Sequence, residues 1–283
     1  MMCAWKELLA VMPPRLRSEV DRLGKEDLQE LRLRVNSPPE LVLRSGCRWL
    51  SGESTREELS FCVNAASRYS PWSAATAVKG YITAPGGHRI GLCGEAVCKD
   101  GQACGIREVK SLCIRVARDF PGIGKKADLQ GSVLILGAPG WGKPTLLRDI
   151  CRRMAETETV SVVDERGELF PDGFGRGKRM DVLTGCPKAE GVEMVLRTMG
   201  PACIAVDEIT APADAEALVQ AANCGVRLLA TAHAASAKEF RRRPIYRPLI
   251  EQGIFETLVV LRQDKSYSVE WLAFCVTSGL ERC

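Results

Sequence analysis

Histidine is scarce in this chain: only His88 and His233 occur among 283 residues. The thirteen cysteines contain no Cys-x-x-Cys pair. Since structural zinc sites use closely spaced Cys and His ligands, we do not expect one here. We read the cysteines as free thiols of a reducing cytosol that mostly act as small buried hydrophobes.

Long apolar runs are also missing. No run approaches the roughly 18 residues that span a bilayer, and the start of the chain, Met1–Glu7, carries no secretory signal pattern. The net charge of +4 is mild, and 46% hydrophobic with 26% charged residues is ordinary for a globular protein. We therefore expect a cytoplasmic chain with no transmembrane segment, and the charge by itself does not indicate nucleic-acid binding.

The first part of the chain mixes helix and strand signals, and we expect a smaller α+β domain over residues 1–122. Apolar residues at helical spacing start near Arg15 and include Leu28, and from Leu31 they alternate as in a strand. The other expected elements are a strand at Leu41–Leu43, a helix at Glu57–Tyr69, a hairpin of Gly80–Thr83 and His88–Leu92 around Pro85–Gly87, and a strand near Ser111–Ala117.

The second part, residues 123–283, alternates short apolar strands with helices. The glycine-rich stretch Pro121–Lys126 marks the predicted boundary. Fully apolar strands indicate a parallel sheet covered on both faces, hence an α/β fold. The expected strands are Val133–Leu136, Val160–Val163, Cys203–Val206 and Arg227–Ala230, and the expected helices are Thr145–Met154, Gly191–Met199 and Asp214–Asn223.

A glycine-rich loop with the spacing G-x-x-x-x-G-K joins the first of these strands to its helix. Its backbone N–H groups can curl around phosphates, and Lys143 can reach the β- and γ-phosphates. The alternative is a glycine-rich turn that binds nothing. The predicted ATP-binding residues are Gly137, Ala138, Pro139, Gly140, Trp141, Gly142, Lys143, Pro144 and Thr145.

Position 144 departs from this motif, because Ser or Thr usually follows the lysine and binds Mg²⁺ through its hydroxyl. Pro144 has no hydroxyl and no N–H, although its ring is tolerated in a first helical turn. Thr145 lies one residue on, rotated by about 100°, which makes it a poor replacement metal ligand. We expect weak Mg·ATP binding and slow turnover.

Polar residues follow three other predicted strands. Asp207-Glu208 has the pattern of a Walker B element, with Asp207 toward Mg²⁺ and Glu208 as the residue that polarises water. Glu165, in the pair Asp164-Glu165, and His233 end neighbouring strands and should lie on the same rim. Lys143, Glu208, Glu165 and His233 are the predicted catalytic residues. The alternatives are solvated acids at strand ends and a structural histidine; His88 we read as structural.

These residues together make the chain similar to the stage III sporulation protein AA family. The most specific segment is Gly185-Cys186-Pro187-Lys188-Ala189-Glu190-Gly191. The resemblance also rests on Glu30–Arg34, Gly80–Thr83, Gly86–Gly91, Ile114–Arg118, the phosphate loop with Leu146–Asp149, Val163–Arg166, Asp181–Leu183, Val206–Glu208 and Thr231–His233. The chain differs from the family pattern at Trp141, Pro144, Met180 and Thr184.

The resemblance implies a RecA-like ATPase core and a motor related to secretion and pilus ATPases. It implies a hexameric ring that uses ATP and Mg²⁺, in the mother-cell cytoplasm against the inner face of a membrane complex, with sporulation channel proteins as partners. Related rings use arginines that reach a neighbour's nucleotide, and Arg115, Arg118 and Arg197 are the candidates here.

Two other functions stay open. Pro144 favours a nucleotide-binding scaffold of the same ring that hydrolyses ATP poorly. Some chloroplast and cyanobacterial relatives resemble this core joined to a nucleic-acid module, but we expect no nucleic-acid partner, because only about 20 residues follow Leu261.

Overall fold

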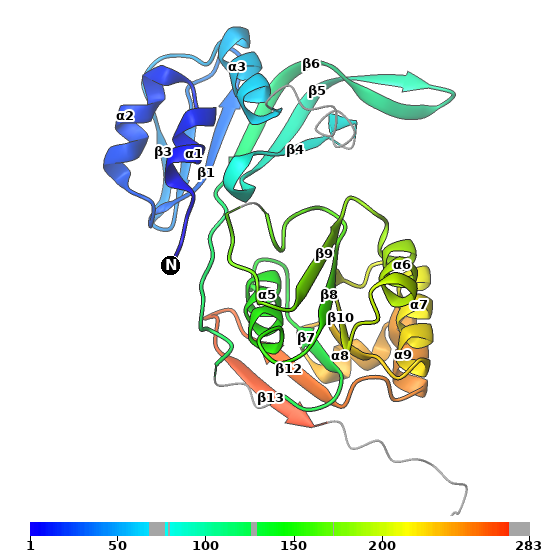
Figure 1. The fold of residues 1–283 in the computed structure, drawn as a ribbon. Helices are drawn as coiled ribbons and strands as arrows, with labels where there is room; N and C mark the ends of the chain where they lie inside the picture. Colours follow the sequence, from blue (N-terminus) through cyan, green and yellow to red (C-terminus); the bar gives the residue numbers. More distant parts are fainter. Residues whose placement is uncertain (68–76, 79, 126–128, 172, 272–283) are drawn as a thin grey trace, which may run out of the picture. The chain divides into compact units, whose positions relative to one another are not determined.

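A computed structural model describes residues 1–67, 77–78, 80–125, 129–171 and 173–271. Contacts divide the chain into two compact units: Met1–Asp119 with Pro171–Phe174, and Phe120–Phe170 with Gly175–Cys283. This division falls between Asp119 and Phe120. The domain boundary that the sequence predicts, between residues 122 and 123, remains a prediction. Figure 1 labels most of the helices and strands of both units.

The first unit is a six-stranded antiparallel sheet of order β3-β2-β1-β6-β5-β4, packed against helices. Strands β5 and β6 continue as a long two-stranded ribbon (Figure 1). The elements are α1 (Trp5–Val11), α2 (Pro14–Leu23), β1 (Leu28–Arg34), β2 (Glu40–Leu43), β3 (Gly46–Trp49), α3 (Arg56–Ser67), β4 (Tyr81–Thr83), the 3₁₀ turn η1 (Pro85–Gly87), β5 (Arg89–Lys99) and β6 (Gln102–Arg115).

The second unit is a seven-stranded sheet of order β13-β12-β7-β11-β10-β8-β9, in which only β13 is antiparallel to its neighbour. Its elements are β7 (Val133–Leu136), α5 (Lys143–Met154), β8 (Val160–Asp164), β9 (Met180–Thr184), α6 (Lys188–Thr198), β10 (Cys203–Glu208), α7 (Pro212–Asn223), β11 (Arg227–Ala232), α8 (Ala237–Arg242), η2 (Pro244–Tyr246), α9 (Arg247–Glu251), β12 (Thr257–Leu261) and β13 (Tyr267–Trp271).

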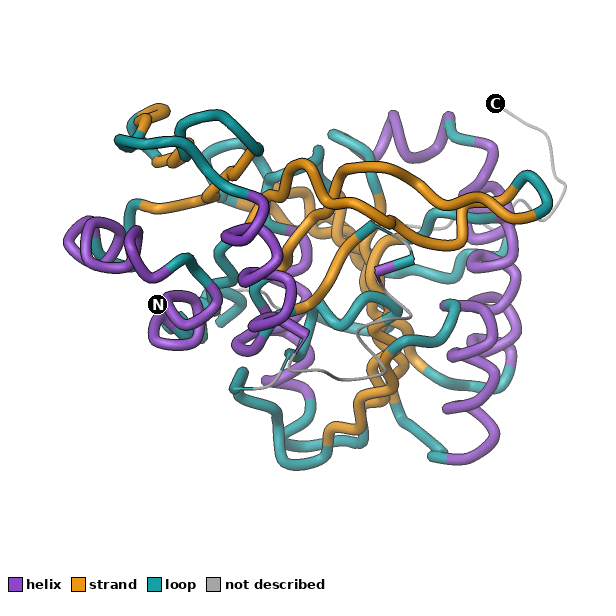
Figure 2. The backbone as a smooth tube through the Cα atoms, turned by 90° about the horizontal axis from the view of Figure 1, so that it is seen from above, coloured by secondary structure: helices purple, strands orange, loops and turns teal. Residues whose placement is uncertain are grey.

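Both faces of the second sheet are covered, which is why buried apolar residues point to both sides of its central strands. Leu134, Val206 and Ala230 point into the core that includes α6 and α7. Their strand neighbours Ile135, Ala205 and Leu229 point into the core that includes α5. Figures 1 and 2 show the helices on the two sides of these strands. A parallel sheet with this burial presents only its strand ends to a ligand.

The expected strands of the second unit are confirmed, and its helices begin two or three residues before the predicted positions. In the first unit, the prediction that Leu28 continues the helix was wrong. Gly24, at φ +74°, follows the last turn of α2, and Leu28 already belongs to β1. The predicted helix over 57–69 is α3 as far as Ser67, and its last two positions lie outside the described residues.

Candidate functional site

The site lies along one edge of the second sheet, where four parallel strands end. The strands stand in the spatial order β7-β11-β10-β8. Along their common edge lie, in the same order, the loop after β7, His233 after β11, Asp207-Glu208 at the end of β10 and Glu165 after β8. These strands are parallel and in register, for example Val163 with Val206 and Val206 with Ala230. The topology therefore brings together groups that are up to 96 residues apart in the chain, counting from Gly137 to His233.

The loop of residues 137–142 has the backbone of a phosphate cradle. Gly140 and Gly142 have φ values of +75° and +100°, which residues with a Cβ rarely adopt. Successive amides in such conformations form a concave anion-binding surface, and α5 adds its N-terminus behind it. At Gly137 an added Cβ would lie 3.3 Å from Lys143 Cγ, so the missing side chain leaves room for the lysine stem.

Lys143 lies inside this loop and is only 4% exposed. Its ammonium donates to the carbonyl oxygens of Gly137 (2.8 Å) and Ala138 (3.4 Å). Burial lowers the pKa of Lys143 to about 8, and the nearby carboxylate of Asp207 acts in the opposite direction. The lysine therefore stays largely protonated at neutral pH, and Lys143 and Asp207 face the same site.

His233 connects the loop lysine to the acidic end of β10. Its Nδ1 lies 3.0 Å from Lys143 Nζ, and its Nε2 contacts Glu208 Oε1. Burial, reinforced by the charge of Lys143, lowers the pKa of His233. A neutral ring with Nδ1 accepting from the lysine and Nε2–H donating to the carboxylate fits both contacts. This imidazole can hold Glu208 in a fixed orientation.

Asp207 occupies a break in the register between β10 and β11. Val206 pairs with Ala230 but Glu208 pairs with Thr231, so Asp207 is the extra residue of a bulge. The hydroxyl of Thr231 lies 3.5 Å from Asp207 Oδ1, and burial raises the pKa of Asp207. Bulges re-aim side chains next to active sites. The sequence pattern gave no sign of this one.

The two acids at the end of β8 have different environments. Asp164 is fully buried, and its oxygens accept the backbone N–H groups of Glu168, Leu169 and Phe170 at 2.8–3.1 Å. Burial raises its pKa to about 6. Asp164 therefore anchors the 168–170 loop. Glu165 is partly exposed and accepts a 2.8 Å bond from Lys188, whose part in the site the sequence reasoning missed.

The residues present fit a magnesium ion whose ligands come partly from the protein and partly from the phosphates of a nucleotide. Among the residues that the structure describes, no group of three or more His, Cys, Asp or Glu side chains forms a metal cage. Mg²⁺ commonly takes only one or two carboxylates plus phosphate oxygens, and Asp207 suits that role. The helix contributes less, because Pro144 is its second residue and has no oxygen on its side chain.

The three candidate arginines differ in how they are engaged. Arg118 donates to the carbonyls of Lys25 and Leu28 within the first unit. Arg115, 3.3 Å from Glu30, and Arg197, 2.5 Å from Glu193, keep 62% and 74% of their side chains exposed. The first is thus held by its own unit, and the other two remain the better candidates for contact with a neighbour.

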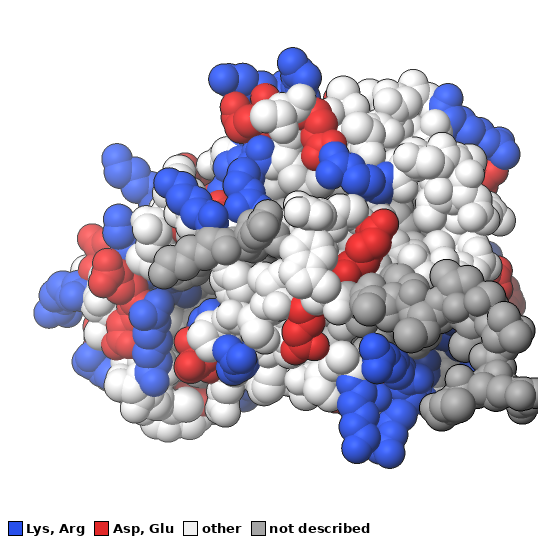
Figure 3. Space-filling view, turned by 90° about the horizontal axis from the view of Figure 1, so that it is seen from below, with Lys and Arg blue, Asp and Glu red and all other residues white. Residues whose placement is uncertain are grey.

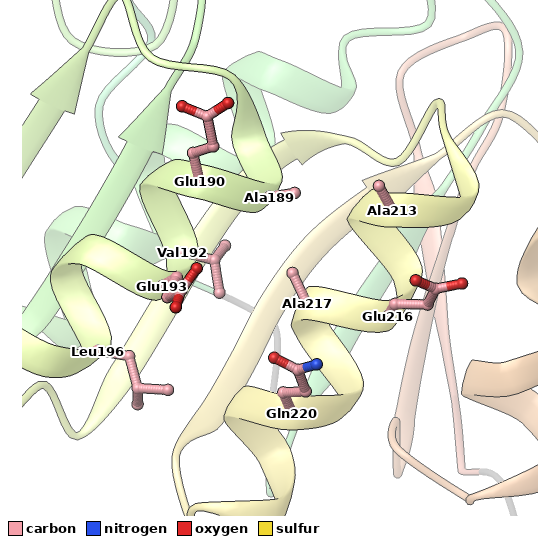
Figure 4. Close-up of a pocket in the computed structure, with 9 residues that line it drawn as sticks. All are labelled: Ala189, Glu190, Val192, Glu193, Leu196, Ala213, Glu216, Ala217 and Gln220. Atoms are coloured by element: carbon pink, nitrogen blue, oxygen red, sulfur yellow. The ribbon is translucent and has the colours of Figure 1, made fainter.

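A groove between α6 and α7 is a poor phosphate site. Figure 4 shows Ala189 and Val192 of α6 beside Ala217 of α7, with carboxylates around them. Glu190, Glu193 and Glu216 line the groove and would repel a phosphate. The loop at the sheet edge therefore remains the candidate nucleotide site.

Comparison with known sequences shows the family to which this chain belongs. The family model for sporulation stage III, protein AA, matches residues 5–269. The stage III sporulation protein AA of Bacillus subtilis (strain 168) is 32% identical over 306 aligned positions, which cover 98% of this chain and 99% of that protein. This chain belongs to the stage III sporulation protein AA family.

Two solved structures show the fold. The pilus retraction motor PilT, determined with bound ADP, superposes with a TM-score of 0.64 at 14% identity, covering 92% of this chain and 82% of its own. The ATPase DotB of Legionella pneumophila gives 0.60 at 19% identity, covering 91% and 79%. The chain therefore has a RecA-like P-loop core, as the family resemblance implied, with a smaller α+β N-terminal part, as the residue pattern predicted. Within the described ranges, no helix is both long and apolar enough to cross a membrane.

Proposed function

We propose that this chain is an ATP-binding motor ATPase of the sporulation channel type, assembled as a homo-oligomeric, hexameric ring. The observation that carries the proposal is the convergence of Lys143, His233, Glu208 and Asp207 on one glycine-rich loop, three of them linked by direct contacts. The family and the motor-ATPase fold support it. The ring would act in the mother-cell cytoplasm, on the inner face of a membrane complex whose channel proteins are its partners.

Each residue has a role that follows from its place. The backbone N–H groups of residues 137–145 other than Pro139 and Pro144 would cradle the ATP phosphates, and Lys143 would leave its carbonyl partners to bind the β- and γ-phosphates. Asp207 would hold Mg²⁺, which supplies charge neutralisation on the phosphate oxygens. Glu208, oriented by His233, would polarise the attacking water. Glu165 would complete the acidic side of the site.

Pro144 decides between the motor and the alternative of a scaffold that binds nucleotide but hydrolyses it poorly. Proline at the second helical position removes one N–H donor and the hydroxyl that usually contacts Mg²⁺. A charge-assisted hydrogen bond of this kind contributes about 1.5–3 kcal/mol. Weakened Mg·ATP binding and slow hydrolysis are therefore the expected behaviour of this chain.

The test compares the unaltered chain with Pro144→Thr. We expect Pro144→Thr to hydrolyse ATP roughly 10- to 100-fold faster, from the size of the restored hydrogen bond, and Lys143→Ala to lose nucleotide binding. Binding of a fluorescent ADP analogue and release of phosphate are measured side by side. Equal, brisk hydrolysis by the unaltered chain and by Pro144→Thr would contradict the role given to Pro144. Absent nucleotide binding in the unaltered chain would refute the motor and the scaffold together.

A nucleic-acid-binding function has less support. On the face drawn in Figure 3, Lys and Arg side chains form separate groups with acidic and uncharged surface between them. Proteins that follow a nucleic-acid backbone present a basic stripe or patch. A single-strand binding assay at low salt tests this alternative, and binding that weakens steeply with added salt would favour it.

A further inference from the structure

A second lysine contacts the phosphate loop, and no role above uses it. Lys265 lies in the turn between β12 and β13, and its ammonium donates to the carbonyl oxygen of Gly140. An added Cβ at Gly142 would lie 3.9 Å from Lys265 Cδ, so the lysine stem runs beside the loop. Strand β12 pairs with β7 in parallel, and the turn after β12 therefore stands next to the loop after β7.

The backbone of this turn favours glycine at the position that Lys265 occupies. Lys265 N–H donates to Arg262 O at 3.0 Å, and Arg262 N–H donates to Ser266 O at 2.9 Å, which is the pattern of a three-residue hairpin loop. The last residue of such a loop is left-handed, and glycine adopts that conformation at the least cost. Lys265 adopts it with a φ of +71°. A lysine held there against its backbone preference indicates a use for its side chain.

The contact with Lys265 fixes the direction of one peptide group of the loop. The carbonyl and the N–H of a planar trans peptide point in opposite directions, so the N–H of Trp141 points away from Lys265. That N–H donates to Ala138 O at 3.3 Å, and Lys143 Nζ donates to the same oxygen at 3.4 Å. The Trp141 amide is therefore turned toward the lysine of the candidate nucleotide site.

The direction of this peptide matters for phosphate binding. Pro139 and Pro144 supply no N–H, so the loop depends on its remaining amides. The φ of +75° at Gly140 and its missing side chain let the peptide that follows it rotate more freely than other peptides. The side chain of Trp141 packs against the core that includes α5. The peptide between the two residues is thus the part that needs to be held.

We propose that Lys265 is a positioning residue of the nucleotide site, which holds the Gly140–Trp141 peptide so that its N–H can bind a phosphate oxygen beside Lys143. The proposal rests on the proposed function, because it assumes that the loop binds the phosphates of a nucleotide. Lys143 would bind phosphate directly, whereas Lys265 acts through the carbonyl of Gly140. A lysine that only attracted phosphate by its charge would not affect this peptide before nucleotide binds.

The chain offers a probe of this one peptide, because Gly140-Trp141 is its only Gly-Trp pair. When glycine carbonyl carbons carry ¹³C and tryptophan nitrogens carry ¹⁵N, an NMR spectrum that correlates bonded carbonyl and amide groups contains a single signal. In the ligand-free full chain, we expect Lys265→Gly to move the Gly140 carbonyl resonance upfield, because the carbonyl loses a charged donor. Lys265→Arg, which keeps a charged donor, should move it much less.

Nucleotide binding should weaken in the same variants. We expect Lys265→Gly to bind the fluorescent ADP analogue about three- to tenfold more weakly than the unaltered chain, which corresponds to one hydrogen bond. Lys265→Arg should stay close to the unaltered chain. Glycine suits the left-handed position, so the first variant should fold, and Lys265→Asn is a second uncharged variant that tolerates this conformation.

The matched control is Arg262→Gln, which removes a positive charge from the same turn. Arg262 donates to Ser266 Oγ at 3.3 Å, within the turn itself. This variant should leave both the Gly140 carbonyl resonance and the affinity for the analogue nearly unchanged.

The inference is overturned, and the proposed function stands, if the unaltered chain binds the analogue and one of three results is found. The first is an unmoved Gly140 carbonyl resonance in Lys265→Gly and Lys265→Asn. The second is unchanged affinity in these two variants, and the third is an equal loss of affinity in Arg262→Gln. If the unaltered chain does not bind the analogue, the proposed function fails and the inference fails with it.

Discussion

The two histidines of the chain serve opposite purposes. His233, at the edge of the second sheet, contacts both Lys143 and Glu208. His88 is fully buried in the first unit, with Nε2 2.9 Å from Ala4 O and Nδ1 accepting the N–H of Ala117 at 3.1 Å. His233 thus connects two charged side chains in the second unit, whereas His88 connects two distant backbone segments in the first unit.

His88 makes the first unit sensitive to acid. Burial lowers the pKa of His88 below its ordinary value of 6.5, so the unfolded chain binds the extra proton more readily and stability falls as the pH drops below 6.5. The loss is limited to about 1.4 kcal/mol per pH unit. We expect hydrogen exchange in β4 and β5, corrected for its intrinsic pH dependence, to speed up between pH 7.5 and 5.5, and to do so less in His88→Gln. Equal acid responses in the two proteins would contradict this.

Helices α5 and α6 each place a lysine at or beside the site. Helix α5 provides Lys143, and its buried Asp149 accepts the N–H groups of Gly122 and Gly124 at 2.7 Å, which holds the preceding segment against the helix. Helix α6 places Lys188 through its contact with β8. Each helix thus connects a backbone constraint to a charged group at the sheet edge.

The close packing of α6 can be tested at Gly191. In Gly191→Ala the new Cβ meets Val163 Cγ1 at 2.5 Å and Leu183 Cδ2 at 3.4 Å. Such overpacking costs about 1–3 kcal/mol. Alanine is favoured over glycine within a helix by about 1 kcal/mol, so this gain offsets only part of the cost. We expect a lower free energy of unfolding of the second unit in urea and looser Lys188–Glu165 pairing. Gly105→Ala, in β6 of the first unit, is the control for an added methyl group that meets no neighbour within 4 Å, and it should leave the second unit unchanged. Greater stability in Gly191→Ala would disprove the account.

At the scale of the whole molecule, each unit has its own hydrophobic core. Residues of α1–α3 and the six-stranded sheet form the core of the first unit. The second unit has one core on each face of its sheet. Since the candidate nucleotide site is built from residues of the second unit alone, ligand binding should stabilise that unit directly.

ADP should therefore protect the two units unequally. A ligand at 100 times its Kd stabilises the state that binds it by about 2.7 kcal/mol. We expect slower hydrogen exchange in β7, β10 and α5 with ADP, little change in β1 and β6, and no effect of ADP in Lys143→Ala. Protection spread equally over both sheets would contradict a site confined to the second unit.

Much of the second unit could be predicted from local pattern. Apolar strands such as Val133–Leu136 need both faces covered, and the glycines and lysine of the loop have few uses other than binding phosphate. The placement of Glu165, Asp207 and His233 on one edge of the sheet could also be predicted, because the carboxyl ends of parallel strands meet at a common edge. The same local reasoning failed at Leu28, because helical spacing in the sequence does not reveal where Gly24 turns the chain.

The chain itself carries the loop chemistry, the missing hydroxyl at Pro144 and the alternation of strands and helices, since these depend on residue type and on neighbours within a few positions. The bulge at Asp207, the Lys143–His233–Glu208 contacts and the approach of Lys188 to Glu165 depend on strand register and helix packing. Those arise from contacts between segments 23 to 90 residues apart, which no local pattern encodes.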